Sequence, residues 1–386
     1  MAYNITIFGQ MIHFISRLDF KSIVNQHNGD HRIRKFSCWD QFVFLLFGQF
    51  SKRESLRETV LSINSVQSKL YHLGCKSVKR STFSDANNKR PYQIYQELFY
   101  RLLSQTQKIA PKHKIKLNRK LYILDATTID LCLTLFPWAR FRRTKSAIRL
   151  HTLMQADGSL PVFLNITDGK VHETQAAKSM PIPKGSYLAI DRGYHDFNQY
   201  NVYINNNIHF ITRMKTNAKY QVVKTYQTNP DSNIISDEIV EFTGYYTHRK
   251  CPHPLRRIEY FDKEQNKVII FLTNDLENTA QTITDIYKAR WDIELFFKTI
   301  KQNLKIKRFF GTTRNAVLTQ IWIAMIAYLM ISFFKFLYKT KLSIQQLLRL
   351  IQVNIFERKS LKDLIEYKII KPPGSEIELQ ICLFKF

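Results

Sequence analysis

Cysteine is scarce in this chain, and no two cysteines stand close enough in sequence to form a CxxC pair. The 386 residues include five, at Cys38, Cys75, Cys132, Cys251 and Cys382. Zinc sites and disulfide-stapled domains need cysteines at short, repeated spacings, so this pattern indicates neither. The pattern is typical of a protein of the reducing cytoplasm.

A secretion signal is also missing, and only one segment is long and apolar enough to suggest a membrane span. The first 25 residues include Asp19 and Lys21, whereas a signal peptide has a basic start and an uninterrupted apolar core. Residues 316–337 are mostly apolar and could cross a membrane by length, but Gln320 and Lys335 interrupt them. We interpret this segment as a helix buried in the core of a soluble protein and expect no membrane partner.

Acidic residues are few relative to basic ones. The chain has 31 Asp and Glu against 58 Lys and Arg, which gives a formal net charge of +27. Such an excess does not help folding, because like charges repel one another. We therefore expect a polyanionic partner, with nucleic acid as the first candidate. The alternative is a generally basic or ribosome-associated protein.

The apolar pattern divides the chain into four regions. Residues 1–75 follow the helical period and predict an N-terminal helical DNA-binding domain, with an ordinary solvated helix face as the alternative for its basic surface. Residues 76–118 predict a basic helical linker region. Residues 119–312 predict an α/β domain with a β-rich insertion at about 215–267, and residues 313–386 predict a helical C-terminal region.

Short, continuous apolar runs in the α/β region are typical of strands buried on both faces. Residues 121–124 form one such run, which ends on Asp125, and residues 187–190 form another, which ends on Asp191. Between these runs, Asp157-Gly158 separates two further apolar segments and favours a hairpin turn. The order of elements predicts a mixed α/β domain with a central sheet.

A long helix is expected at about residues 279–304, with one polar stripe along its apolar face. Tyr287, Arg290, Glu294 and Lys301 lie within roughly 60° of one another on a helical wheel. Glu294 could bind a metal there, and the two cations could hold phosphates on either side of it. The alternative is a solvated helix with ordinary ion pairs, worth about 0.3–0.5 kcal/mol each.

The two aspartates that follow apolar runs, together with Glu294, suggest a shared cation. An ionised carboxylate at the edge of a core needs a partner. Oxygen ligands without a Cys or His cluster favour Mg²⁺ or Mn²⁺ over zinc. Two such ions would suit in-line attack on a phosphodiester. Asp125, Asp191 and Glu294 are therefore the candidate metal-binding and catalytic residues.

The stripe of the predicted helix reproduces a Tyr-x2-Arg-x3-Glu-x6-Lys signature, and its surroundings, YKARWDIELFFKTIKQNLKIK, resemble the insertion sequence four (IS-four) family of bacterial DDE transposases. LDATTIDL and AIDRGY resemble the segments around that family's first and second aspartates. KRSTFSDANNKRP resembles the leader domain of one branch, so the resemblance covers nearly the whole chain. It implies a ribonuclease H-like catalytic domain whose three carboxylates hold two Mg²⁺ or Mn²⁺ ions.

The same resemblance implies a bacterial insertion-sequence transposase that works by cut and paste. The protein would bind terminal inverted repeats, excise its element through a hairpin DNA end, and join the 3′ ends to target DNA. It would act as a homodimer in a synaptic complex, in the cytoplasm and at the nucleoid when bound. Tyr287, Arg290 and Lys301 would contact the transposon end near the cleaved phosphate.

Further basic and aromatic residues are candidates for DNA contacts. Arg142 and Arg143 belong to a basic loop, and Arg80 lies in the segment that resembles the leader domain. Trp291 matches a position where the resemblance implies an aromatic beside a flipped base, and a core or edge tryptophan is the alternative. A second aromatic could come from the insertion, at Tyr245, Tyr246 or Tyr260.

Four residues near the candidate site leave alternatives open. His172-Glu173 could help catalysis, but a helix cap is the favoured interpretation. Asp130 lies close to Asp125, and Asp196 close to Asp191, so either could be mistaken for the ligand.

Overall fold

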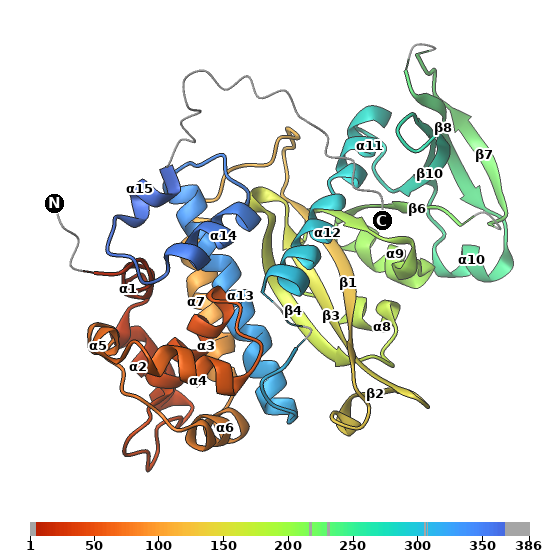
Figure 1. Ribbon diagram of the computed structural model, residues 1–386. Helices are drawn as coiled ribbons and strands as arrows, with labels where there is room; N and C mark the ends of the chain where they lie inside the picture. The colour runs from red at the N-terminus through yellow and green to blue at the C-terminus, as the bar shows by residue number, and fades with distance from the viewer. Residues whose placement is uncertain (1–4, 216–217, 230–231, 305, 307, 367–386) are drawn as a thin grey trace, which may run out of the picture.

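The computed structural model describes residues 5–215, 218–229, 232–304, 306 and 308–366. A helical part and a part built on a large sheet lie side by side in it (Figure 1). The helical part combines helices from both ends of the chain, which appear in red to orange and in blue. Cys382 and the rest of the predicted C-terminal region beyond residue 366 lie outside the described residues.

Short polar side chains begin several helices of the helical part. Ser37 and Asp40 form a reciprocal capping box at one of these starts, and Ser343 and Gln346 form another. Between such starts the apolar residues recur at the helical period and are buried. The helices are α1 (Ile7–His13), α2 (Arg17–Gln26), α3 (Cys38–Phe50), α4 (Leu56–Asn64), α5 (Gln67–Leu70), α6 (Arg80–Lys89), α7 (Gln93–Gln107), α13 (Arg314–Leu337), α14 (Ile344–Asn354) and α15 (Leu361–Glu366).

The two helices α6 and α7 fall in the region where we expected a linker, but they are part of the helical core. α7 and α3 both pack on α13. Trp322 of α13 lies 5.3 Å from Phe99 and 5.9 Å from Tyr100, both on α7, measured between ring centroids. After α7, residues 108–120 lead to the sheet without helix or strand. The sequence did not reveal the packing of α7 on α13, because these two helices lie far apart along the chain.

One helix among the described residues, α13, is apolar and long enough to cross a membrane by length and composition alone. In its most apolar window 94% of the residues are buried inside this chain. That burial agrees with the interpretation of residues 316–337 as a core helix.

The described part of the chain contains one sheet of 10 strands. β1 pairs in parallel with β5 and antiparallel with β3, and β4 pairs with the other edge of β3. The order β2-β3-β1-β5-β6-β10-β9-β8-β7 places the predicted insertion, which also holds α10 (Tyr245–Lys250), as an extension of the same sheet. The strands are β1 (Leu121–Leu131), β2 (Arg140–Arg142), β3 (Lys145–Gln155), β4 (Leu160–Asp168), β5 (Tyr187–Ile190), β6 (His209–Arg213), β7 (Tyr220–Thr225), β8 (Ile234–Phe242), β9 (Leu255–Asp262) and β10 (Lys267–Thr273).

Both faces of the sheet are covered near β1, as the apolar run at residues 121–124 predicts. Leu121 and Ile123 belong to the large core that includes α11 (Ala280–Lys288), α12 (Trp291–Lys298) and the helical part. Tyr122 and Leu124 belong to a second core with residues of α9 (Phe197–Asn205) and α8 (Glu173–Lys178). This arrangement follows from the alternation of side chains along a strand.

The predicted hairpin at Asp157-Gly158 is confirmed. β3 and β4 pair antiparallel on either side of it. Gly158 has φ +67°, and a Cβ there would lie 2.9 Å from the ring of Phe336. Glycine is needed at this position both for the backbone conformation and for the close approach of α13.

His151 on β3 should make the fold sensitive to acid. Burial lowers the pKa of His151 from 6.5 to about 4, with Arg149 acting in the same direction. The folded pKa lies below the unfolded one, so this stability is present above pH 6.5 and is lost as the pH falls toward 4. A shift from 6.5 to about 4 corresponds to roughly 3 kcal/mol. Urea denaturation of the His151→Gln variant should show a shallower loss of stability between pH 6.5 and 4 than the parent chain. The exposed His72→Gln variant should follow the parent, and equal slopes in all three proteins would contradict the prediction.

Candidate functional site

Asp125 and Asp191 lie next to each other on neighbouring parallel strands. The pairing of β1 with β5 ends with Leu124 opposite Ile190, and each aspartate is the next residue. Residues in register on adjacent strands point to the same face. Asp125 shares its face with Ile123, whose core includes α11 and α12. Both carboxylates therefore lie at one edge of the parallel pair, on the face that α12 covers.

β1 does not end where its apolar run ends. β1 continues to Leu131, because it remains paired with β3 from Asp125 opposite Thr152 to Leu131 opposite Ser146. The apolar run ends at Asp125 because β5 ends there. One side of β1 is thus left open at the position of the carboxylate.

The predicted continuous helix over residues 279–304 is interrupted twice. α11 ends at Lys288, α12 begins at Trp291, and a π-helical segment, η5 (Thr299–Asn303), follows α12. In the turn between α11 and α12, the N–H of Arg290 donates to the carbonyl of Tyr287 at 3.0 Å. Glu294 stands on α12, which packs against β1. Because of the break and the π-helical segment, Tyr287, Arg290, Glu294 and Lys301 do not follow the single stripe of a uniform helical wheel.

Arg290 joins two of the three candidate carboxylates. Its Nη1 donates to Asp125 Oδ2 at 3.2 Å, and its Nη2 donates to Glu294 Oε1 at 2.6 Å. The side chain of Arg290 is 11% exposed, against 17% for Asp125 and 36% for Glu294. In a site this shielded, each charge needs a partner. The planar guanidinium provides one for both carboxylates.

The pKa of Asp125 is raised by burial and by nearby negative charge. Burial raises the pKa of Asp125 to about 7, and the carboxylates of Asp191 and Glu294 act in the same direction. The backbone N–H of Ala126, which donates to Asp125 Oδ1 at 2.7 Å, and Arg290 oppose that rise. Asp191 and Glu294 are thus both near enough to act on Asp125.

These side chains suit a hard divalent cation. The site offers carboxylate oxygens, which Mg²⁺ and Mn²⁺ prefer to nitrogen or sulfur. Within the described residues, no three His, Cys, Asp or Glu side chains are already gathered into a metal cluster. In this structure the guanidinium of Arg290 provides positive charge between Asp125 and Glu294.

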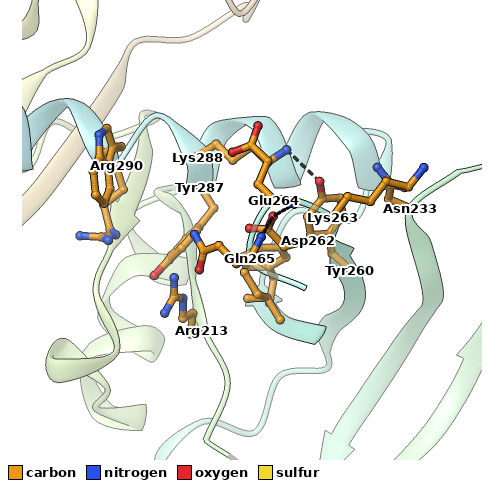
Figure 2. Close-up of a pocket in the computed structure, with 13 residues that line it drawn as sticks. Arg213, Asn233, Tyr260, Asp262, Lys263, Glu264, Gln265, Tyr287, Lys288 and Arg290 are labelled. Carbon is orange, nitrogen blue, oxygen red and sulfur yellow. Dashed lines mark hydrogen bonds between the residues drawn. The ribbon is translucent and has the colours of Figure 1, made fainter. Parts of the chain in front are cut away.

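Arg213 is a site residue that the sequence analysis missed. It ends β6, which is parallel to β5, and its guanidinium carbon lies 5.3 Å from the ring centroid of Tyr287. Arg290 lies 5.6 Å from the same ring. Figure 2 shows Arg213 and Tyr287 pointing toward one another below α11. A charged residue at the end of β6 was the available signal, because β6 is the parallel neighbour of β5, which ends beside Asp125.

A cavity of about 650 Å³ opens beside these residues, between α11, α12 and the strands of the insertion. Trp291 lines it and is 58% exposed, which excludes a core position and leaves an edge tryptophan or a base-stacking residue. Tyr260 forms part of the wall, and its hydroxyl accepts a hydrogen bond from Lys288 Nζ at 2.8 Å. Tyr245 and Tyr246 stand exposed on α10 and are not among the residues that line this cavity.

The remaining candidate DNA contacts lie on several elements. Lys301 is half-buried on η5. Arg142 and Arg143 are exposed at the turn of the β2–β3 hairpin. Arg80 is exposed at the first position of α6. The structure therefore brings Tyr287, Arg290 and Glu294 together, while these basic residues are spread over other elements.

The alternative acidic residues have other roles or places. Asp130 is exposed on β1, and Asp196 caps α9 by accepting from the N–H of Asn198 at 3.0 Å. His172 holds the N-cap position of α8, but its side chain makes no capping hydrogen bond. Glu173 lies closer to the candidate site than the capping interpretation implies, since a Cβ added to Gly193 would approach both Glu173 Oε2 and Asp191 Oδ2.

Comparison with protein families finds matches over most of the chain. A family described as the transposase DDE domain matches residues 116–330, and a family described as a domain of unknown function matches residues 3–76. The first match spans β1, β5 and α12, and therefore Asp125, Asp191 and Glu294.

Individual relatives agree with that match. The chain is 30% identical over 281 residues to the "Putative transposase y4zB" of Sinorhizobium fredii. The alignment covers 72% of this chain and 78% of the relative. It is 28% identical over 252 residues to the "Probable transposase for insertion sequence element IS5377" of Geobacillus stearothermophilus. This alignment covers 65% of this chain and 66% of that protein. Among solved structures, the piggyBac transposase in a synaptic complex with hairpin DNA aligns with a TM-score of 0.42 and 10% identity, over 96% of this chain and 81% of that one.

Proposed function

The chain belongs to the DDE transposase family, and from that premise we propose that it moves an insertion sequence by cutting DNA at the ends of the element and joining those ends to a new site. The observation that supports this proposal is that Arg290 bridges Asp125 and Glu294, while Asp191 follows the strand paired with β1 and acts on Asp125. We further propose that the chain is a member of the IS-four branch with its Tyr-Arg-Glu-Lys signature. The sheet β4-β3-β1-β5-β6 would then be a ribonuclease H-like core.

Asp125, Asp191 and Glu294 would hold the divalent ions, two Mg²⁺ or Mn²⁺. When bound, such ions stabilise the attacking and leaving oxygens of an in-line displacement at phosphorus. Arg290 can exchange its carboxylate partners for a phosphate of the DNA, since guanidinium binds both groups with paired hydrogen bonds. Arg290 would then hold the cleaved phosphate next to the carboxylates, while Tyr287 and Arg213 fix its position from behind.

The surrounding basic residues would bind the DNA backbone. Lys301 would contact the transposon end close to the cleaved phosphate, and Arg142, Arg143 and Arg80 would contact phosphates farther away. Exposed cations of this kind account for the net charge of +27. We propose that two copies of the chain pair two transposon ends, in a bacterial cytoplasm and at the nucleoid.

Trp291 is the proposed stacking partner for a base flipped out of the transposon end. Its ring is exposed at the cavity beside Arg290, where a displaced base could enter. Stacking on an aromatic ring is worth about 1–3 kcal/mol per base, so Trp291→Ala should reduce hairpin formation by about tenfold or more. Denaturing gels of end-labelled DNA measure this product. Trp291→Phe is the matched control, because it keeps an aromatic ring at the same place and should retain most of the activity. A Trp291→Ala protein that forms hairpins at the parent rate would contradict the role.

The proposed reaction can be tested on DNA that carries the inverted repeats flanking this gene. Purified protein with Mg²⁺ should release the fragment between the repeats and leave hairpins on its ends. Neither product should form with EDTA or with scrambled repeats. Specific binding to the repeats without cleavage in either Mg²⁺ or Mn²⁺ would favour a DNA-binding protein that has kept only the fold.

A further inference from the structure

A fourth carboxylate lies beside the candidate metal site. Glu173 begins α8, which packs on the turn that follows Asp191. A Cβ added to Gly193 in that turn would lie 2.0 Å from Glu173 Oε2 and 3.9 Å from Asp191 Oδ2. Both carboxylates therefore approach the same point, and a side chain at position 193 would displace the Glu173 carboxylate from it.

Arg149 holds Glu173 in this position. Its Nη1 lies 3.7 Å from Glu173 Oε1 and donates to the carbonyl of Val171 at 3.1 Å. The distance between the two charged groups is long for an ion pair, so this pair contributes little to the stability of the fold. The other oxygen of the Glu173 carboxylate, Oε2, is the one that lies next to Gly193.

Tyr194 is an independent sign that this place receives a ligand. Its side chain is 1% exposed, and its hydroxyl has no hydrogen-bond partner among the described residues. The hydroxyl lies near enough to Asp125, Glu173 and Asp191 for all three to act on it, and burial keeps the pKa of Tyr194 above its usual value. The Tyr194 hydroxyl is therefore a neutral hydrogen-bond donor with carboxylate acceptors nearby. Burying it without a hydrogen bond costs free energy of folding.

We propose that Glu173 is a fourth acidic ligand of the catalytic centre, sharing with Asp191 one of the two divalent cations, and that Tyr194 donates its hydroxyl hydrogen to this carboxylate cluster. This inference rests on the proposed function, because it assumes that Asp125, Asp191 and Glu294 hold those cations. It accounts for Gly193, for the unpartnered hydroxyl, and for a carboxylate that the capping interpretation leaves unexplained.

Binding of Mn²⁺ to the full-length protein, followed by electron paramagnetic resonance without DNA, tests the inference apart from activity. Glu173→Gln should weaken one Mn²⁺ site by about tenfold or more, and Tyr194→Phe should weaken it several-fold, as loss of supporting groups usually does. Arg149→Gln removes the same ion pair but keeps the carboxylate, so it should weaken the site less than Glu173→Gln does. The exposed Glu277→Gln is the matched control and should bind as the parent does.

The possible results distinguish a failure of the fourth ligand from a failure of the proposed transposase function. If Asp191→Asn weakens Mn²⁺ binding while Glu173→Gln and Tyr194→Phe do not, the fourth ligand is refuted and the three-carboxylate site stands. If neither the parent nor any variant binds Mn²⁺, both ideas are overturned. Melting curves in EDTA check folding. Tyr194→Phe removes only an unpartnered hydroxyl, so this variant should stay folded and keep the test decisive.

Discussion

Replacing Asp125 or Asp191 with asparagine, or Glu294 with glutamine, should reduce DNA cleavage by about a thousandfold or more. Each change keeps the size of the side chain but removes one negative charge that the proposed divalent ions require. Metal-ion catalysis contributes several kcal/mol of transition-state stabilisation, and each 1.36 kcal/mol is a factor of ten in rate. Single-turnover cleavage of labelled transposon ends in Mg²⁺ measures the effect.

Binding to the transposon ends should remain within about threefold of the parent in all three variants, because backbone contacts by basic residues dominate affinity. Asp130→Asn is the matched control, since Asp130 is exposed on the same strand as Asp125. It should leave both binding and cleavage unchanged. Metal-dependent cleavage that survives in all three variants would rule out these carboxylates as the catalytic centre.

Local sequence patterns predict much of the fold because they report on burial near each residue. The runs at residues 121–124 and 187–190 predict strands covered on both faces, and the structure confirms both. Asp157-Gly158 predicts a turn, because the left-handed conformation at Gly158 favours glycine. The apolar segment at residues 316–337 predicts a core helix for the same local reason.

Features that depend on distant contacts were not accessible from the sequence. The length of β1 beyond Asp125 depends on its pairing with β3, and the packing of α7 depends on α13. The interruption at Arg290 occurs within a segment whose periodicity looks continuous. Arg213 and Glu173 reach the site only because β6 and α8 are folded against the strand ends. The sequence named Glu173 as a possible catalytic helper but gave no sign that it lies beside Asp191, and Arg213 stands in no motif.

Arg290→Ala should destabilise the metal-free protein and respond unusually to Mg²⁺. Removing the guanidinium leaves Asp125 and Glu294 without their shared partner, and breaking a buried ion pair from one side costs about 3 kcal/mol or more. Since Glu294 is 36% exposed, we expect the lower end of that range. Bound Mg²⁺ would neutralise the same carboxylates, so it should raise the melting temperature of Arg290→Ala by more than it raises that of the parent.

The same variant separates the structural from the chemical role of Arg290. In Mg²⁺, where much of its stability returns, Arg290→Ala should still cleave about a hundredfold more slowly, because a positioned donor to the reacting phosphate is lost. Arg290→Lys keeps one charge but cannot bridge two oxygens, so its stability and its rate should both fall between those of Arg290→Ala and the parent. An Arg290→Ala protein as stable as the parent in EDTA would show that the bridge between Asp125 and Glu294 does not contribute to the fold. Cleavage at the parent rate in Mg²⁺ would remove Arg290 from the phosphate site, because a guanidinium that grips the scissile phosphate cannot be deleted without loss of rate.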